Sequence, residues 1–123
     1  MEHARRDPAH ECCGLLAGRE GAITHALPAA NAASNPATSY EIATRELFVL
    51  MRRMRAARLE FLGIYHSHPN GKTEPSPRDL ELAFYPDVAY FVLSPRAEEP
   101  QPVRAFSIRD GHATELTIEI VAA

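Results

Sequence analysis

The sequence predicts an α/β or α+β domain built around one sheet. Short apolar runs that are typical of strands recur along the chain, and a clear amphipathic helix lies between them. The chain has 123 residues, which is enough for one hydrophobic core but too few for a separate substrate domain. We therefore expect a single domain that spans residues 1–123 and contains more strands than helices.

The first predicted element is a hairpin. Residues 11–18, ECCGLLAG, form a short apolar run closed by glycine, and REG at 19–21 supplies turn residues before the run AITHALPA. The next stretch, ANAASNPATS, is rich in small residues and contains an Asn-Pro pair, which indicates a loop. After this loop we expect a short strand from Tyr40 to Ile42.

The clearest helix is predicted from Thr44 to Arg58. Apolar side chains recur there with the spacing that places them on one helix face, at Leu47, Leu50, Met51 and Met54. Arginines occupy most of the remaining positions near the end of this segment. They could bind an acidic partner, but a solvated helix face explains them more simply.

Further strands are expected after this helix. Residues 61–65, FLGIY, are apolar and partly aromatic, which suits a central strand that leads directly into His66. Residues 88–93, VAYFVL, have the composition of another buried strand. Residues 103–121 alternate apolar and polar on either side of an Asp-Gly pair at 110–111, which predicts a second hairpin.

Chemically distinctive residues lie at the edges of the loop that follows His66. In an extended chain His66 and His68 face the same side, so two imidazoles can converge on one point. Ser76 is a good N-cap for a following helix, and Pro77 is favoured at the first helical position. Asp79 lies in the first turn, where negative charge is favoured.

Each of these residues alone has an ordinary structural explanation, but together they match a divalent metal site. The two histidines and Asp79 would give three protein ligands, and catalytic zinc sites use three with water as the fourth. A structural zinc site normally needs four protein ligands, and no fourth is evident. The sequence leaves open whether Asp79 turns toward the histidines or caps the helix from the surface. His25 and His112 are interpreted as ordinary surface or hairpin residues.

Charge and composition limit the partners. The formal net charge is -3 and no basic stripe is present, which argues against nucleic acid as the main partner. The N-terminal segment is polar and no apolar run approaches the length of a membrane span, so we expect a soluble, cytoplasmic protein with no membrane partner. Cys12 and Cys13 are adjacent, so we expect both to be reduced and mostly buried. The sequence indicates no particular oligomeric state.

Two separated segments resemble those of a known family. The run His66-Ser-His68-Pro, the seven residues from Pro69 to Pro75, then Ser76, two residues and Asp79 resemble the signature H-x-H-x7-S-x2-D of JAMM (MPN+) metalloproteases. The segment ECCGLLAG resembles the one in which that family carries its catalytic glutamate, which corresponds to Glu11. The resemblance covers nearly the whole chain, because the predicted elements come in the family's order.

The resemblance implies both a fold and an activity. The fold would be the MPN fold, similar to that of cytidine deaminase, with a curved, mostly antiparallel sheet flanked by helices. The activity would be a peptidase or isopeptidase that cleaves amide bonds at the C-terminal Gly-Gly tail of a ubiquitin-like or sulfur-carrier protein. By the same resemblance, His66, His68 and Asp79 would bind Zn2+, Glu11 would be the general base and Ser76 would stabilise the oxyanion.

The chain also departs from the family's pattern. Family members usually begin with a strand and a full helix, but only ten residues precede Glu11, so we expect a truncated first helix or a start further upstream. There is no room for the insertions with which eukaryotic members clamp ubiquitin, so a compact prokaryotic type is expected. A RadC-like JAB domain linked to DNA repair and a non-catalytic MPN scaffold are the alternatives. The ECCGLL segment and the complete ligand set favour the peptidase.

Overall fold

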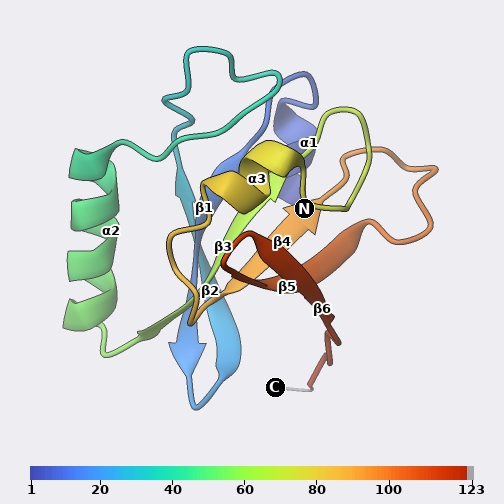
Figure 1. Ribbon diagram of the computed structural model, residues 1–123. Coiled ribbons are helices and arrows are strands. Elements are labelled where there is room, and N and C mark those ends of the chain that lie inside the picture. Colours follow the sequence, from blue (N-terminus) through green and yellow to red (C-terminus); the bar gives the residue numbers. More distant parts are fainter. Residues whose placement is uncertain (122–123) are drawn as a thin grey trace.

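The structure is a computed structural model that describes residues 1–121, and its centre is one six-stranded sheet (Figure 1). The strands lie in the order β2-β1-β3-β4-β5-β6, and every neighbouring pair is antiparallel except β3 and β4. The strand bounds are Cys13–Arg19 (β1), Ala22–Ala29 (β2), Glu60–Ser67 (β3), Ala89–Leu93 (β4), Val103–Arg109 (β5) and His112–Leu116 (β6). This mixed sheet with helices confirms the predicted fold class.

Both predicted hairpins are present, and each turns on a residue pair with positive φ. Glu20 and Gly21 have φ values of 53° and 78° in the β1–β2 turn, and Asp110 and Gly111 have 51° and 76° in the β5–β6 turn. Glycine adopts this left-handed region without steric cost, and two successive positive φ values give turns that match the twist of the strands. The two hairpins place β2 and β6 at the opposite edges of the sheet.

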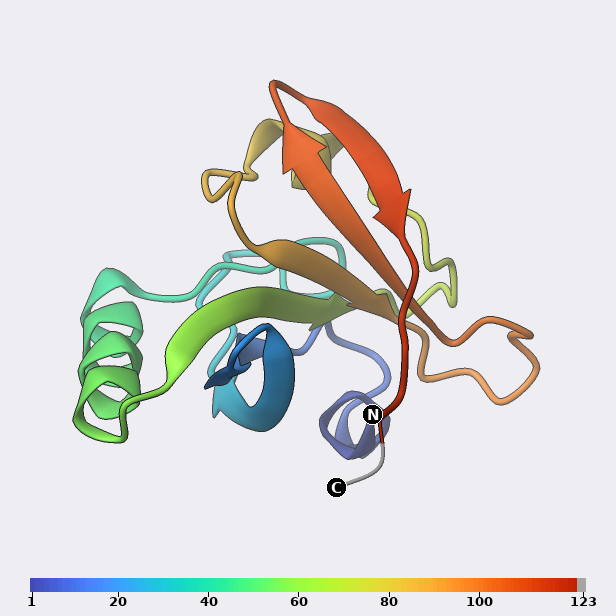
Figure 2. The ribbon, with the colours of Figure 1, turned by 90° about the horizontal axis from the view of Figure 1, so that it is seen from below.

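The helices cover the two faces of the sheet unequally (Figures 1 and 2). Their bounds are Glu2–Arg6 (α1), Thr44–Ala56 (α2) and Pro77–Glu81 (α3). The larger hydrophobic core lies under α2 and α3, and it buries Leu50 and Met54 of the predicted apolar stripe. The smaller core lies on the other face, where α1 contributes Ala4. Within residues 1–121, no helix is long and apolar enough to cross a membrane.

The strand predicted from Tyr40 to Ile42 is wrong. These residues belong to the loop between β2 and α2, and they do not join the sheet. The main chain of Glu41 bonds within the loop instead, because its carbonyl accepts from the amide of Ala32 and its amide donates to the side chain of Asn31. The apolar side chains of the segment still pack against the larger core.

Two predicted elements end earlier than expected. The last strand stops at Leu116, which lies opposite Ala105, and β5 begins at Val103, so little partner strand remains beyond this point. The helix expected to reach Arg58 ends at Ala56. Arg58 has a φ of 57°, a left-handed conformation that commonly closes a helix.

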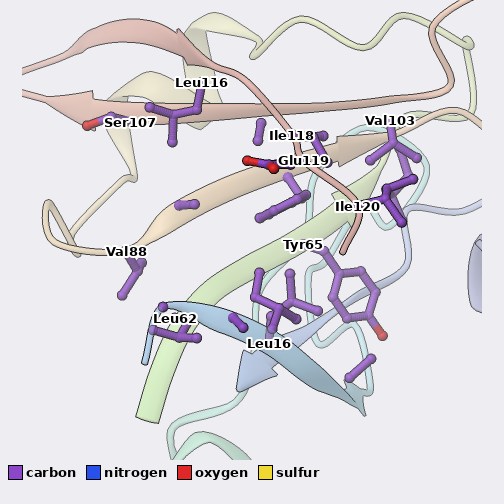
Figure 3. Close-up of a pocket in the computed structure, with 18 of the residues that line it drawn as sticks. Leu16, Leu62, Tyr65, Val88, Val103, Ser107, Leu116, Ile118, Glu119 and Ile120 are labelled. Carbon is purple, nitrogen blue, oxygen red and sulfur yellow. The ribbon is translucent and has the colours of Figure 1, made fainter. Parts of the chain in front are cut away.

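A groove of about 1190 Å³ opens on the face of the sheet that carries α1 (Figure 3). Leu16, Tyr65 and Ile118 are among the side chains that line it. The residues singled out by the sequence analysis as metal ligands do not line this groove. The candidate site is therefore separate from it.

Candidate metal centre

The pairing of β1 with β3 brings Glu11 to the histidines. Cys13 lies opposite His66 in this antiparallel pair. Continuing the same register by two residues places Glu11, which precedes β1, opposite His68. Residues from two distant parts of the sequence are therefore held together at one end of the sheet.

Ser67, between the two histidines, secures this end of the sheet. Its hydroxyl accepts a hydrogen bond from the amide of Cys12 at 2.8 Å, and its own amide donates to the carbonyl of Cys12 at 3.1 Å. On the other side, the amide of His68 donates to the carbonyl of Leu93 in β4 at 2.9 Å. The sequence does not indicate this role of Ser67, because alternation places it on the opposite face but does not show what it contacts.

Four potential ligands converge at this end of β3. One ligand atom from each of Glu11, His66, His68 and Asp79 lies within 4.8 Å of the others. The Nε2 atoms of the histidines are 3.1 Å apart, and each lies 3.0 Å from Oδ2 of Asp79. Around a tetrahedral metal ion with bonds of about 2.0–2.1 Å, ligand atoms are roughly 3.3–3.4 Å apart. The triangle therefore fits a metal ion after a small outward adjustment.

The surroundings of His68 leave its Nε2 free to bind a metal. Its Nδ1 lies 2.9 Å from the carbonyl oxygen of Lys72. Because a carbonyl oxygen can only accept a hydrogen bond, Nδ1 must carry the ring proton. Neutral His68 therefore presents an Nε2 lone pair to the cluster. Histidines that bind metals commonly donate their other ring N–H to a carbonyl in this way.

Asp79 caps α3 and faces the histidines at the same time. Its Oδ2 accepts from the amide of Ser76 at 2.8 Å, and Oγ of Ser76 accepts from the amide of Asp79 at 3.1 Å, which is a capping box. The same Oδ2 lies beside both histidines, and only 9% of the Asp79 side chain is exposed. The helix cap and the inward orientation, which the sequence left as alternatives, are therefore compatible.

Glu11 is a buried carboxylate without a partner. It is 5% exposed, and its Oε1 has no hydrogen-bond partner among residues 1–121. Burial raises the pKa of Glu11 to about 7, although the positive charge of His68 acts to lower it. A carboxyl group that titrates near neutral pH is suited to accepting a proton and returning it.

Asp79 and the histidines affect one another's ionisation. Burial acts to raise the pKa of Asp79, but hydrogen bonds with His66 and His68 outweigh it and hold the pKa well below its usual range. Burial lowers the pKa of His66. Burial also acts to lower the pKa of His68, but the hydrogen bond and charge of Asp79 raise it above its usual value. Asp79 therefore stays ionised around neutral pH, as a metal ligand must.

The remaining candidate residues lie as follows. Ser76 is the N-cap of α3 as predicted, and because its oxygen accepts the backbone hydrogen bond, its hydroxyl proton is free to be donated elsewhere. His25 and His112 are exposed residues of the two hairpins, as expected. Cys12 and Cys13 are free and buried, which confirms that they form no disulfide. Burial raises the pKa of Cys13 to about 12, so its thiol is unreactive.

The chain matches, over residues 1–109, a family described as prokaryotic homologs of the JAB domain. It is 37% identical to the CysO-cysteine peptidase of Mycobacterium tuberculosis, over 98% of this chain and 84% of that protein. It is 37% identical to the desampylase of Haloferax volcanii, over 77% of this chain and 73% of that protein. A probable TtuB-protein conjugate cleaving protease of Thermus thermophilus is 32% identical, over 94% of this chain and 74% of that protein.

Solved structures share the fold. The solution structure of protein DSY2949 from Desulfitobacterium hafniense has a TM-score of 0.79 and 31% identity, and covers 94% of this chain and 81% of its own. AF2198 from Archaeoglobus fulgidus, a JAB1/MPN domain protein, has a TM-score of 0.62 and 17% identity, with 98% and 86% covered. The fold is therefore the MPN/JAB fold that the sequence resemblance implied.

The fold and the Glu-His-His-Asp group together define a JAMM-type, metal-dependent peptidase. The chain belongs to the family of prokaryotic homologs of the JAB domain.

In the metal-free protein, Glu11→Gln is expected to increase stability at alkaline pH. Because folding raises the pKa of Glu11 from 4.5 to about 7, the folded state binds more protons than the unfolded state in this range, and stability falls as the pH rises through it. At about pH 8 the variant should be about 3 kcal/mol more stable than the wild type, and near pH 4 the difference should vanish. Urea unfolding of both chelator-treated proteins measures this difference. An equal difference at both pH values would contradict the shifted pKa.

Proposed function

We propose that this peptidase uses zinc to hydrolyse amide bonds at the C-terminal tail of a ubiquitin-like or sulfur-carrier protein. The observation that carries the proposal is the convergence of Glu11, His66, His68 and Asp79 at the end of β3. The names of the relatives support the substrate class, since one is a CysO-cysteine peptidase and another is a probable TtuB-protein conjugate cleaving protease.

In this proposal His66, His68 and Asp79 hold the metal ion. We infer zinc from the donor set, because two imidazoles and a carboxylate with a fourth, open position are typical of catalytic zinc sites. A zinc ion held there supplies a Lewis acid and lowers the pKa of a bound water molecule. The chain contributes rigidity, since the histidines lie at the end of a central strand and Asp79 is fixed by the capping box.

Glu11 and Ser76 act on the reacting groups themselves. Glu11 accepts a proton from the attacking water and then donates it to the leaving amine, and its raised pKa suits both steps. Ser76 donates a hydrogen bond through its free hydroxyl group to the oxyanion that forms as the carbonyl is attacked. Ser76 is held as the N-cap of α3, and the side chain of Glu11 is buried beside the histidines.

The proposed substrate is an extended Gly-Gly tail on a folded carrier. A tail of two glycines is thin enough to pass the metal ion, and an extended segment can be recognised through its main chain by strand addition. Selectivity would then come from the folded body of the carrier. The leaving group is an amine, such as the α-amine of a cysteine joined to the tail.

About one zinc ion per chain is expected in protein purified without chelators. The double variant His66→Ala, His68→Ala should lose the zinc, because two of its three proposed ligands are absent. The double variant His25→Ala, His112→Ala is the matched control, since it removes two exposed histidines that lie in hairpins. Inductively coupled plasma mass spectrometry, with the protein concentration, gives the number of zinc ions per chain. Wild-type zinc content in the first double variant would refute the ligand assignment.

Glu11→Gln and Ser76→Ala should keep the metal and lose activity for different reasons. Loss of a positioned general base reduces the rate about 10²- to 10⁴-fold, and loss of one oxyanion donor about 10²- to 10³-fold. Ser76→Ala also removes a helix cap, which costs about 1 kcal/mol of stability.

Asp79→Ala should lose zinc and activity together. Zinc content and kcat are compared for the three variants. A wild-type kcat in Glu11→Gln would show that Glu11 is not the general base.

A sulfur-carrier protein whose Gly-Gly tail ends in an added cysteine should lose that cysteine on incubation with the enzyme. Intact mass spectrometry detects the shortened carrier, and Glu11→Gln serves as the inactive control. A free peptide with the same tail and adduct tests whether the folded body matters, and it should be cleaved with a much lower kcat/KM. No cleavage of the carrier, or equal cleavage of the peptide, would contradict the proposed recognition.

A further inference from the structure

The two histidines of the metal-binding group are oriented in different ways. Nδ1 of His68 is bonded to the carbonyl of Lys72, whereas Nδ1 of His66 is buried and has no hydrogen-bond partner in the described part of the chain. Such a bond commonly fixes the ring of a histidine that binds a metal. The ring of His66 must therefore be fixed by other contacts.

Tyr40 provides such a contact. Its ring is stacked on that of His66, with the centroids 4.4 Å apart and the planes inclined by 20°. His68 meets the ring of His66 edge-on, at 4.8 Å and 71°. Together these two contacts restrict rotation of the His66 ring about its Cβ–Cγ bond, which is the rotation that a hydrogen bond to Nδ1 would otherwise prevent.

Asn31 holds the segment that carries Tyr40. Its Nδ2 donates to the carbonyl of Ser39 at 2.9 Å, and its Oδ1 accepts from the amide of Glu41 at 3.1 Å. These two residues flank Tyr40 in the chain. The position of the tyrosine ring is therefore set by hydrogen bonds on both sides of it, although the segment belongs to no strand.

The same Asn31 side chain also reaches the proposed base. Nδ2 donates a second bond to the carbonyl of Glu11 at 2.9 Å, and Oδ1 accepts a second bond from Ala33 at 3.0 Å. The amide of Glu11 in turn donates to the carbonyl of Pro36 in the same loop at 2.7 Å. Both amide protons and both acceptor positions of Asn31 are therefore used.

We propose that Tyr40 is a positioning residue for His66, and that Asn31 keeps Tyr40 in place and joins its loop to Glu11. The inference rests on the metal centre proposed above and assigns a function to residues outside its ligand set. Stacking on Tyr40 replaces the hydrogen bond that His66 lacks. The loop of residues 31–41 thus orients one metal ligand and fixes the main chain of the base.

The zinc affinity of the metal-free protein tests the role of Tyr40, measured by competition with a chromophoric chelator. Tyr40→Leu retains an apolar side chain but removes the flat ring, and it should weaken zinc binding about 10- to 100-fold, as loss of a ligand-orienting contact does. Tyr40→Phe retains the ring and should stay within about twofold of the wild type. Tyr85→Leu is the matched control, because Tyr85 packs against the same core and edge-on against Phe61 rather than against a histidine.

Cobalt(II) bound in place of zinc gives a readout that a general loss of stability does not change. Its visible absorption depends on the arrangement of its ligands. The spectrum of Tyr40→Leu should differ from that of the wild type, whereas Tyr85→Leu and Tyr40→Phe should reproduce the wild-type spectrum. An affinity loss in Tyr85→Leu as large as that in Tyr40→Leu would overturn the inference, because the loss would then follow from core packing.

Asn31→Asp tests the loop without touching His66. The substitution keeps the shape of the side chain but turns an oxygen toward the carbonyls of Glu11 and Ser39, so the loop should loosen and zinc binding should weaken about 10-fold. Wild-type affinity in both Tyr40→Leu and Asn31→Asp would overturn the inference and leave the zinc centre intact. Absence of zinc binding by the wild type would overturn the proposed function instead.

Discussion

The register between β1 and β3 is the constraint on which the site depends. Side chains alternate along β1, so Leu15 enters the larger core while Cys12, before the strand, enters the smaller one on the other face. A slip by one residue would exchange the side chains of the two faces, so that neither core would keep its packing. Hydrophobic burial on both faces of the sheet therefore sets the register that brings Glu11 beside the histidines, and hydrogen bonds from Asn31 and to Pro36 then hold its main chain.

The site also separates two carboxyl groups by their surroundings. Asp79 accepts hydrogen bonds and faces imidazoles, which keep it ionised. Glu11 is buried, and its Oε1 has no partner in the part of the chain that the structure describes; burial raises its pKa to about 7, so it can exchange a proton near neutral pH. Two groups of the same chemical type thus differ in ionisation, which suits the proposed roles of Asp79 as a ligand and Glu11 as a proton carrier. The unpaired oxygen is unfavourable for the metal-free fold, which is a common property of groups kept for chemistry.

Local signals made most of the fold predictable, and long-range contacts account for what was missed. The Asp-Gly turn, the strand that contains His66 and the Ser76 cap depend on near neighbours in the chain, so their sequence patterns were sufficient. The closeness of Glu11 to the histidines depends on strand pairing across the chain, and only the family resemblance indicated it. The strand predicted at Tyr40 was wrong because a side chain, Asn31, takes the hydrogen bond that a neighbouring strand would need. A single asparagine in a loop rich in small residues gives no periodic signal.

Helix α3 has only five residues, and its capping carboxylate is also a proposed ligand. A helix of this length is not stable in water by itself, because too few hydrogen bonds repay the ordering of its backbone. An ion bound by Asp79 would stabilise the helical form of Pro77–Glu81, so a measured dissociation constant would also contain the free energy of ordering this helix. A substitution in α3 that never contacts the ion would then alter its apparent affinity, simply by changing how often the helix is formed.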